Sequence, residues 1–208
     1  MGFELVGLHW TPERFEEYLN NSFSQSGLDW AKRVTVHHTA HPNLAQRPNG
    51  WTVQHMKNLA SYYGKELAWS AGPHLFTDDD EVYGLSSLWR RGVHARSFNS
   101  DSIGIECLGN YDVEDPTTGR GYNCMNTTAK VVASILKVKG LTANSETIKF
   151  HREDPKSSKT CPGKLVDRSW FVGLVKSHMS SPANEVYPSK ELNLEQRIER
   201  LEKRLNIT

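Results

Sequence analysis

Hydrophobic residues in this chain follow two patterns: short runs rich in β-branched residues, and longer segments in which apolar residues recur every three or four positions. Short apolar runs bounded by turn residues are typical of buried strands, whereas the longer spacing is typical of amphipathic helices. The runs predict strands over 34–40, 74–77, 81–84, 103–108 and 147–150, with 74–84 forming a hairpin. The spaced segments predict helices over 11–19, 51–64, 127–139 and 165–176, and the polar segment 109–126 is expected to be a long loop.

The composition changes after residue 180, which predicts a main domain over 1–180, a linker over 181–190 and an amphipathic helix over 191–208. In the last segment Leu194, Ile198, Leu201 and Leu205 are spaced four, three and four positions apart. This spacing indicates coiled-coil character, although a helix of about two heptads is marginal on its own. Two outcomes stay open: the helix folds back on the main domain, or it joins copies of the chain into a homo-oligomer.

Two histidines lie at the end of the first strongly apolar run, and a second polar cluster lies far downstream. In open α/β sheets ligands collect beyond the carboxyl ends of strands, where His37 and His38 are expected. The segment 151–163 adds His151 and Cys161, and two imidazoles with one thiolate can hold zinc with its fourth position open. Because neighbouring strand residues point to opposite faces, we expect one of His37 and His38 to coordinate, and the spacing does not say which.

Composition and charge then exclude several classes of protein. A chain of 208 residues with 37% hydrophobic residues can bury a sizeable core, and a net charge of +1 disfavours a nucleic-acid partner. Three cysteines at wide spacing do not indicate a disulfide framework. We find no secretory signal and no stretch near the roughly 20 apolar residues that cross a bilayer. We therefore expect synthesis in the cytoplasm, without membrane insertion.

Four motifs occur in the order found in one family of proteins. They are Val36-His37-His38-Thr39-Ala40, Gly72-Pro73-His74-Leu75-Phe76, Ser102-Ile103-Gly104-Ile105-Glu106, and His151 followed by Lys159-Thr160-Cys161-Pro162-Gly163. Over about residues 30–175 the chain resembles the type 2 N-acetylmuramoyl-L-alanine amidases, whose fold is shared by peptidoglycan recognition proteins. The segment 44–48 and the Gly-Pro-His-Leu-Phe motif are most similar to phage-encoded endolysins of this family.

The resemblance implies a fold and a reaction. It implies an α/β domain with a central mixed β-sheet, helices on both faces and a zinc ion in a surface groove. Members of the family hydrolyse the amide between N-acetylmuramic acid and L-alanine in peptidoglycan. Carried over by motif position, the Zn²⁺ ligands are His37, His151 and Cys161, so the resemblance selects His37 over His38.

The resemblance also implies catalytic roles. Lys159 matches the family lysine that stabilises the oxyanion of the tetrahedral intermediate, for which a positive group is needed. Glu106 matches a strand glutamate that activates water, and a salt bridge is the alternative for a carboxylate in an apolar strand. Pro73 stands where many relatives carry a tyrosine, so that tyrosine's role is vacant. The expected substrate contacts are His38, His74, His94 and Asn99.

Three functions follow as alternatives. The first is a phage endolysin that is made in the host cytoplasm and acts on the cell wall after release. The second is a peptidoglycan-binding module without catalysis, which the retained ligand types and Lys159 argue against. The third is a bacterial amidase that recycles or remodels the wall. In each case the expected partner is peptidoglycan.

Overall fold

A computed structural model describes residues 2–23 and 25–180 of the chain, so the expected linker and carboxyl-terminal helix over 181–208 lie outside the described residues. The described part is built on a six-stranded sheet in the order β1-β4-β3-β5-β2-β6. The strands are β1 (His9–Trp10), β2 (Arg33–His38), β3 (Leu75–Thr77), β4 (Val82–Gly84), β5 (Ser102–Cys107) and β6 (Ile148–Phe150). The short strand β1 was not predicted.

The sheet is parallel where β2 lies and antiparallel toward one edge. β2 pairs in parallel with β5 and β6, and β3 pairs in parallel with β5. β4 is antiparallel to both β3 and β1. The mixed α/β sheet that the resemblance implies is therefore confirmed. A parallel strand covered on both faces is mostly apolar: Val34 and Val36 are 0% exposed, and the buried Thr35 hydroxyl is paired with the Ser102 hydroxyl.

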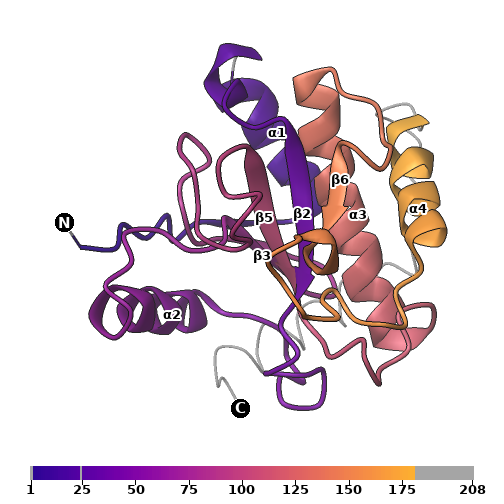
Figure 1. Ribbon diagram of the computed structural model, residues 1–208, viewed down its shortest axis with the longest axis horizontal. Helices are drawn as coiled ribbons and strands as arrows, with labels where there is room; N and C mark the ends of the chain where they lie inside the picture. The colour runs from indigo at the N-terminus through magenta and orange to yellow at the C-terminus, as the bar shows by residue number, and fades with distance from the viewer. Residues whose placement is uncertain (1, 24, 181–208) are drawn as a thin grey trace.

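Within the described residues, four α-helices pack around the sheet: α1 (Pro12–Ser22), α2 (Val53–Lys65), α3 (Gly119–Lys139) and α4 (Arg168–Ser180). There are also short 3₁₀ turns, η1 (Gln25–Leu28) and η2 (His151–Glu153). Helix α3 packs against both α1 and α4, and Figure 1 shows these three gathered on one side of the sheet. Helix α2 lies apart from them and contacts β4. None of the described helices is long and apolar enough to cross a membrane.

The predicted loop over 109–126 is wrong in its second half, because α3 begins at Gly119. Glycine and asparagine in 119–123 have low helix propensity, but tertiary contacts override it. The Arg120 guanidinium donates two hydrogen bonds to the Asp79 carboxylate, both 2.7 Å, and further bonds to the carbonyls of Leu44 and Arg47. The last helix also begins later than its pattern predicts, at Arg168, where the Asp167 carboxylate accepts a hydrogen bond from the Trp170 amide.

Candidate active site

The carboxyl end of β2 brings three separate parts of the chain to one edge of the sheet. In the parallel register His37 lies beside Glu106 of β5, and Val36 lies beside Phe150, the last residue of β6. His151 follows β6 directly, so its imidazole extends over the same edge as that of His37. The Arg152 amide donates to the Cys161 carbonyl at 2.7 Å, which ties the later loop to this turn.

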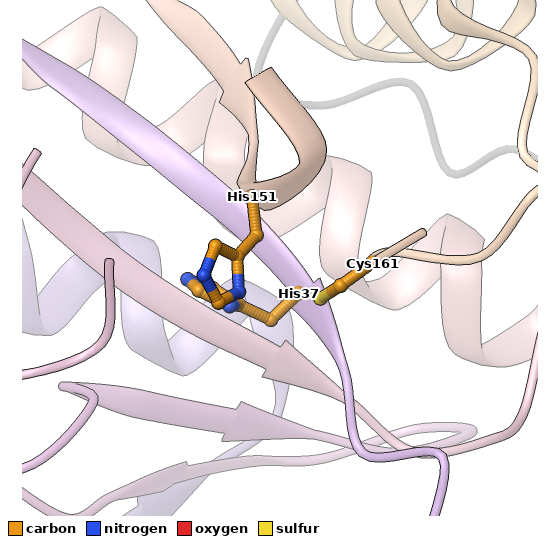
Figure 2. A group of neighbouring side chains, drawn as sticks. All are labelled: His37, His151 and Cys161. Carbon is orange, nitrogen blue, oxygen red and sulfur yellow. The ribbon is translucent and has the colours of Figure 1, made fainter. Parts of the chain in front are cut away.

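His37, His151 and Cys161 form a cluster of potential metal ligands. One ligand atom from each lies within 4.8 Å of the other two, and Figure 2 shows the three side chains converging from β2, the turn after β6 and a loop. The backbone amide of His38 donates a hydrogen bond to the Cys161 sulfur at 3.3 Å. His38 therefore contributes its main chain to this cluster, and its ring is not part of it.

The loop that carries Cys161 is held by Tyr111 and Asp112. Gly163 has φ +110°, and a Cβ there would come within 2.4 Å of the Tyr111 backbone, so only glycine fits. The Thr160 hydroxyl and the Lys164 amide both donate to the Asp112 carboxylate, at 2.7 and 2.8 Å. The Thr160–Gly163 stretch is thus fixed against the segment after β5.

The donor chemistry of this cluster fits a zinc ion. Zinc bonds of about 2.0–2.3 Å place tetrahedral ligands roughly 3.3–3.8 Å apart, and the ligand atoms of this cluster lie within 4.8 Å of one another. Burial lowers the pKa of both His37 and His151, so their imidazoles are neutral and keep a lone pair. Burial raises the pKa of the Cys161 thiol, so its thiolate needs a nearby cation. A zinc ion would supply that cation.

Glu106 lies next to the cluster, with its Oε1 atom 3.7 Å from Nδ1 of His37. Burial raises the pKa of this carboxyl to about 8, and the nearby charge of Lys159 acts in the opposite direction. A carboxyl that exchanges its proton near neutral pH is suited to general acid and base catalysis. The salt bridge considered as the alternative is present only as this 3.7 Å contact, toward a ring whose pKa burial lowers.

A cavity of about 800 Å³ opens over the cluster. Its walls come from the end of β2, the loop after it, helix α2 and the loop carrying Cys161. Lys159 lines this cavity as an exposed residue, and its charge lowers the pKa of His37, His151 and Glu106 alike. The ammonium group therefore acts electrostatically on the whole cluster.

The four expected substrate contacts differ in their surroundings: His38 and His94 line the cavity, whereas His74 and Asn99 do not. His38 lines the cavity, and its Nδ1 accepts a hydrogen bond from the Tyr111 amide at 3.1 Å. His74 does not line it: the ring is fully buried, Nδ1 accepts from the Gly104 amide and Nε2 lies 3.0 Å from the Arg90 carbonyl. Asn99 uses its carbonyl oxygen to accept from the amides of His94 and Ala95. His74 and Asn99 therefore have structural contacts in place of the expected substrate contacts.

The side of the cavity formed by α2 carries residues that sequence reasoning did not assign to the site. They are Arg47, His55, Asn58, Tyr62 and Tyr63. Tyr63 and Pro73 line the same cavity, so a phenol is present although Pro73 occupies the family's tyrosine position. Tyr63 lies on the helix predicted over 51–64, and only the placement of α2 relative to the sheet could have revealed that its side chain lines the cavity.

Comparisons with known proteins agree with this geometry. A sequence model described as N-acetylmuramoyl-L-alanine amidase matches residues 28–164. Peptidoglycan-recognition protein SC2 of Drosophila simulans is 29% identical over 132 residues, which are 62% of this chain and 67% of that protein.

Two solved structures have a similar fold. N-acetylmuramoyl-L-alanine amidase LysC from Clostridium intestinale URNW superposes with a TM-score of 0.54 at 19% identity, over 71% of this chain and 86% of that one. Drosophila peptidoglycan recognition protein SD does so with a TM-score of 0.52 at 22% identity, over 65% of this chain and 76% of that one. The family match spans most of the chain, and the chain therefore belongs to the N-acetylmuramoyl-L-alanine amidase family.

Proposed function

We propose that this protein is a zinc-dependent amidase that hydrolyses the bond between N-acetylmuramic acid and L-alanine in peptidoglycan. The observation that carries the proposal is the convergence of His37, His151 and Cys161 at the floor of a large cavity that also contains Glu106 and Lys159. Membership of the amidase family and similarity to a peptidoglycan-recognition protein support the substrate.

His37, His151 and Cys161 would hold the zinc ion. When bound, zinc acts as a Lewis acid that makes water a usable nucleophile near neutral pH and polarises the scissile carbonyl. Glu106, next to His37, takes the proton of the attacking water and returns it to the nitrogen of the leaving L-alanine. The low polarity that raises the pKa of Glu106 also makes this carboxylate a stronger base than an exposed one.

Two groups in the cavity suit the charge that develops on the carbonyl oxygen. The ammonium group of Lys159 provides a positive charge. This charge lowers the pKa of His37, Glu106 and His151, which supports an electrostatic effect of Lys159 on the cluster. His38 adds a donor: because its Nδ1 accepts from the Tyr111 amide, the neutral ring carries its proton on Nε2. Both groups line the cavity.

We further propose that the biological role is that of a phage endolysin, which is made in the host cytoplasm and reaches the cell wall after release. The support for this role is the similarity of segment 44–48 and of the Gly-Pro-His-Leu-Phe motif to phage members of the family. A wall-recycling amidase would catalyse the same reaction, and a binding module without catalysis would share the cavity.

One digestion experiment separates the amidase from the binding module. Purified peptidoglycan is treated with the protein and the soluble products are identified by mass spectrometry, with metal content measured on the same sample. The amidase proposal requires free stem peptides that begin with alanine and about one zinc per chain. Binding to the wall without such peptides, by protein that contains zinc, would support the binding module.

A further inference from the structure

The imidazole of His94 lies against that of His37, and both residues line the cavity. Nε2 of His37 and Nδ1 of His94 are 3.1 Å apart, and the two rings are nearly perpendicular at 89°. The other ring nitrogen of His94, Nε2, lies 3.0 Å from the carbonyl oxygen of Ser102. Two imidazoles and one backbone carbonyl therefore form a continuous hydrogen-bonded chain.

The carbonyl at the end of this chain decides where the protons lie. The Ser102 carbonyl can only accept, so Nε2 of His94 must be the donor. A neutral imidazole carries a single proton, so once Nε2 of His94 holds it, Nδ1 of His94 is an acceptor. The bond between the rings then requires that Nε2 of His37 carries the proton, which leaves the lone pair of His37 on Nδ1.

His94 is held in this position from two sides. A Cβ at residue 104 would come within 2.4 Å of the His94 ring, so the ring packs directly on the bare backbone of Gly104 in β5. The carbonyl oxygen of Asn99 accepts from the amides of His94 and Ala95, at 2.9 and 2.8 Å, and so fixes the backbone. The Ser97 amide donates to the Asp154 carboxylate at 2.9 Å, which joins this loop to the turn after His151.

We propose that His94 is a positioning residue that fixes the orientation and the tautomer of His37, so that Nδ1 of His37 is presented as the metal ligand. The inference rests on the proposed zinc site. His94 also lines the cavity, so the substrate contact expected for it stays a prediction, although both of its ring nitrogens have partners in the protein. Gly104 and Asn99 support the same arrangement by holding the His94 ring and backbone.

The first test reads the tautomer of His37 in metal-free protein, so it does not depend on zinc binding or on activity. Proton–nitrogen correlation spectra of ¹⁵N-histidine-labelled protein are recorded at about pH 8, where unperturbed imidazoles are neutral. The signals of His37 are identified by their loss in a His37→Asn variant. The proposal requires a protonated Nε2 and an unprotonated Nδ1 in the native protein; a protonated Nδ1 would overturn it.

The second test measures zinc affinity by competition with a chelator. A residue that hydrogen-bonds to a ligating histidine typically contributes about 10- to 100-fold to metal affinity, so His94→Ala should lose that much. His94→Gln should recover most of it, because one amide offers an acceptor to His37 and a donor to the Ser102 carbonyl. Gly104→Ala keeps both imidazoles but displaces the His94 ring, so it should weaken zinc binding as well.

His178→Ala is the matched control, because His178 is half-buried and bonds to Asn126, on helices away from the cavity. This control should lower the melting temperature about as much as His94→Ala does, but it should leave zinc affinity unchanged. Native-like zinc affinity in folded His94→Ala would overturn the proposal, as would a loss in His94→Gln equal to that in His94→Ala. Absence of zinc binding by the native protein would instead overturn the proposed zinc site, with the tautomer still measurable.

Discussion

Replacing Glu106 by glutamine separates the catalytic role of this carboxyl from its cost to the fold. Glutamine has the same shape but cannot accept the proton of the attacking water. Positioned general acids and bases contribute about 10²- to 10⁴-fold to rate, which corresponds to roughly 3–5 kcal/mol of barrier. We therefore expect Glu106→Gln to lose activity by at least about 100-fold while its zinc content stays that of the native protein.

The same substitution should stabilise the metal-free protein. The pKa of Glu106 is raised by burial from 4.5 to about 8. A raised carboxyl pKa means that the folded state binds its proton more tightly, so stability falls as the pH rises from 4.5 toward 8. At about 1.36 kcal/mol per pH unit, the native chain has lost roughly 3 kcal/mol by pH 7, and the glutamine variant avoids this loss.

The assay is urea unfolding of both chains in chelator between about pH 4.5 and 8, with wall digestion measured on the zinc-loaded forms. The stability difference should be close to zero at the acidic end and grow with pH. A glutamine variant that digests walls within about tenfold of the native rate would refute the catalytic role. Equal stabilities at about pH 7 would refute the argument that the carboxyl is desolvated.

Three further substitutions, two in the cavity and one in the buried core beside it, can be tested. Lys159→Ala should keep zinc and lose about 10²- to 10³-fold in turnover. Lys156 is an exposed lysine in the same loop that does not line the cavity, so Lys156→Ala should digest walls normally. A larger loss of turnover in Lys156→Ala than in Lys159→Ala would contradict the assignment. Cys161→Ser should weaken zinc binding in chelator competition. Because a ligand that binds only the folded state stabilises that state, the substitution should also lower the melting temperature of the zinc-loaded protein toward that of the metal-free protein. An unchanged zinc affinity would exclude Cys161 as a ligand. Burial lowers the pKa of His74 to about 3, so the stability that this neutral ring contributes is present above pH 6.5 and is lost as the pH falls. His74→Asn keeps an acceptor for the Gly104 amide, so in urea unfolding it should lose less stability than the native chain between about pH 6.5 and 4. Equal losses of stability in the two chains would count against this account.

The strongest elements of the fold could be predicted because their local pattern agrees with their environment. The β-branched run Val34–Val36 fits a strand that is covered on both faces, and its position next to β5 and β6 gives that environment. The start of α3 could not be predicted, since Gly119 and Gly121 oppose a helix locally. What stabilises this first turn is the bond between Arg120 and Asp79, residues 41 positions apart.

The ligand residues could be proposed from the sequence because their motifs mark strand ends that the parallel register then brings together. The surrounding histidines could not be assigned in the same way, because their roles depend on which partner each ring nitrogen meets. His74 bonds only to backbone groups, whereas His94, twenty residues later, bonds to His37. Both sit beside glycines, Gly92 and Gly104, whose missing Cβ atoms make room for the rings.

The central claim is that His37, His151 and Cys161 bind one zinc ion whose remaining position is open to water. X-ray absorption at the zinc edge of the native protein tests it most directly. The account predicts four-coordinate zinc with one sulfur at about 2.3 Å and three nitrogen or oxygen ligands at about 2.0–2.1 Å, two of them imidazoles. A shell without sulfur, or with six oxygen ligands, would contradict it.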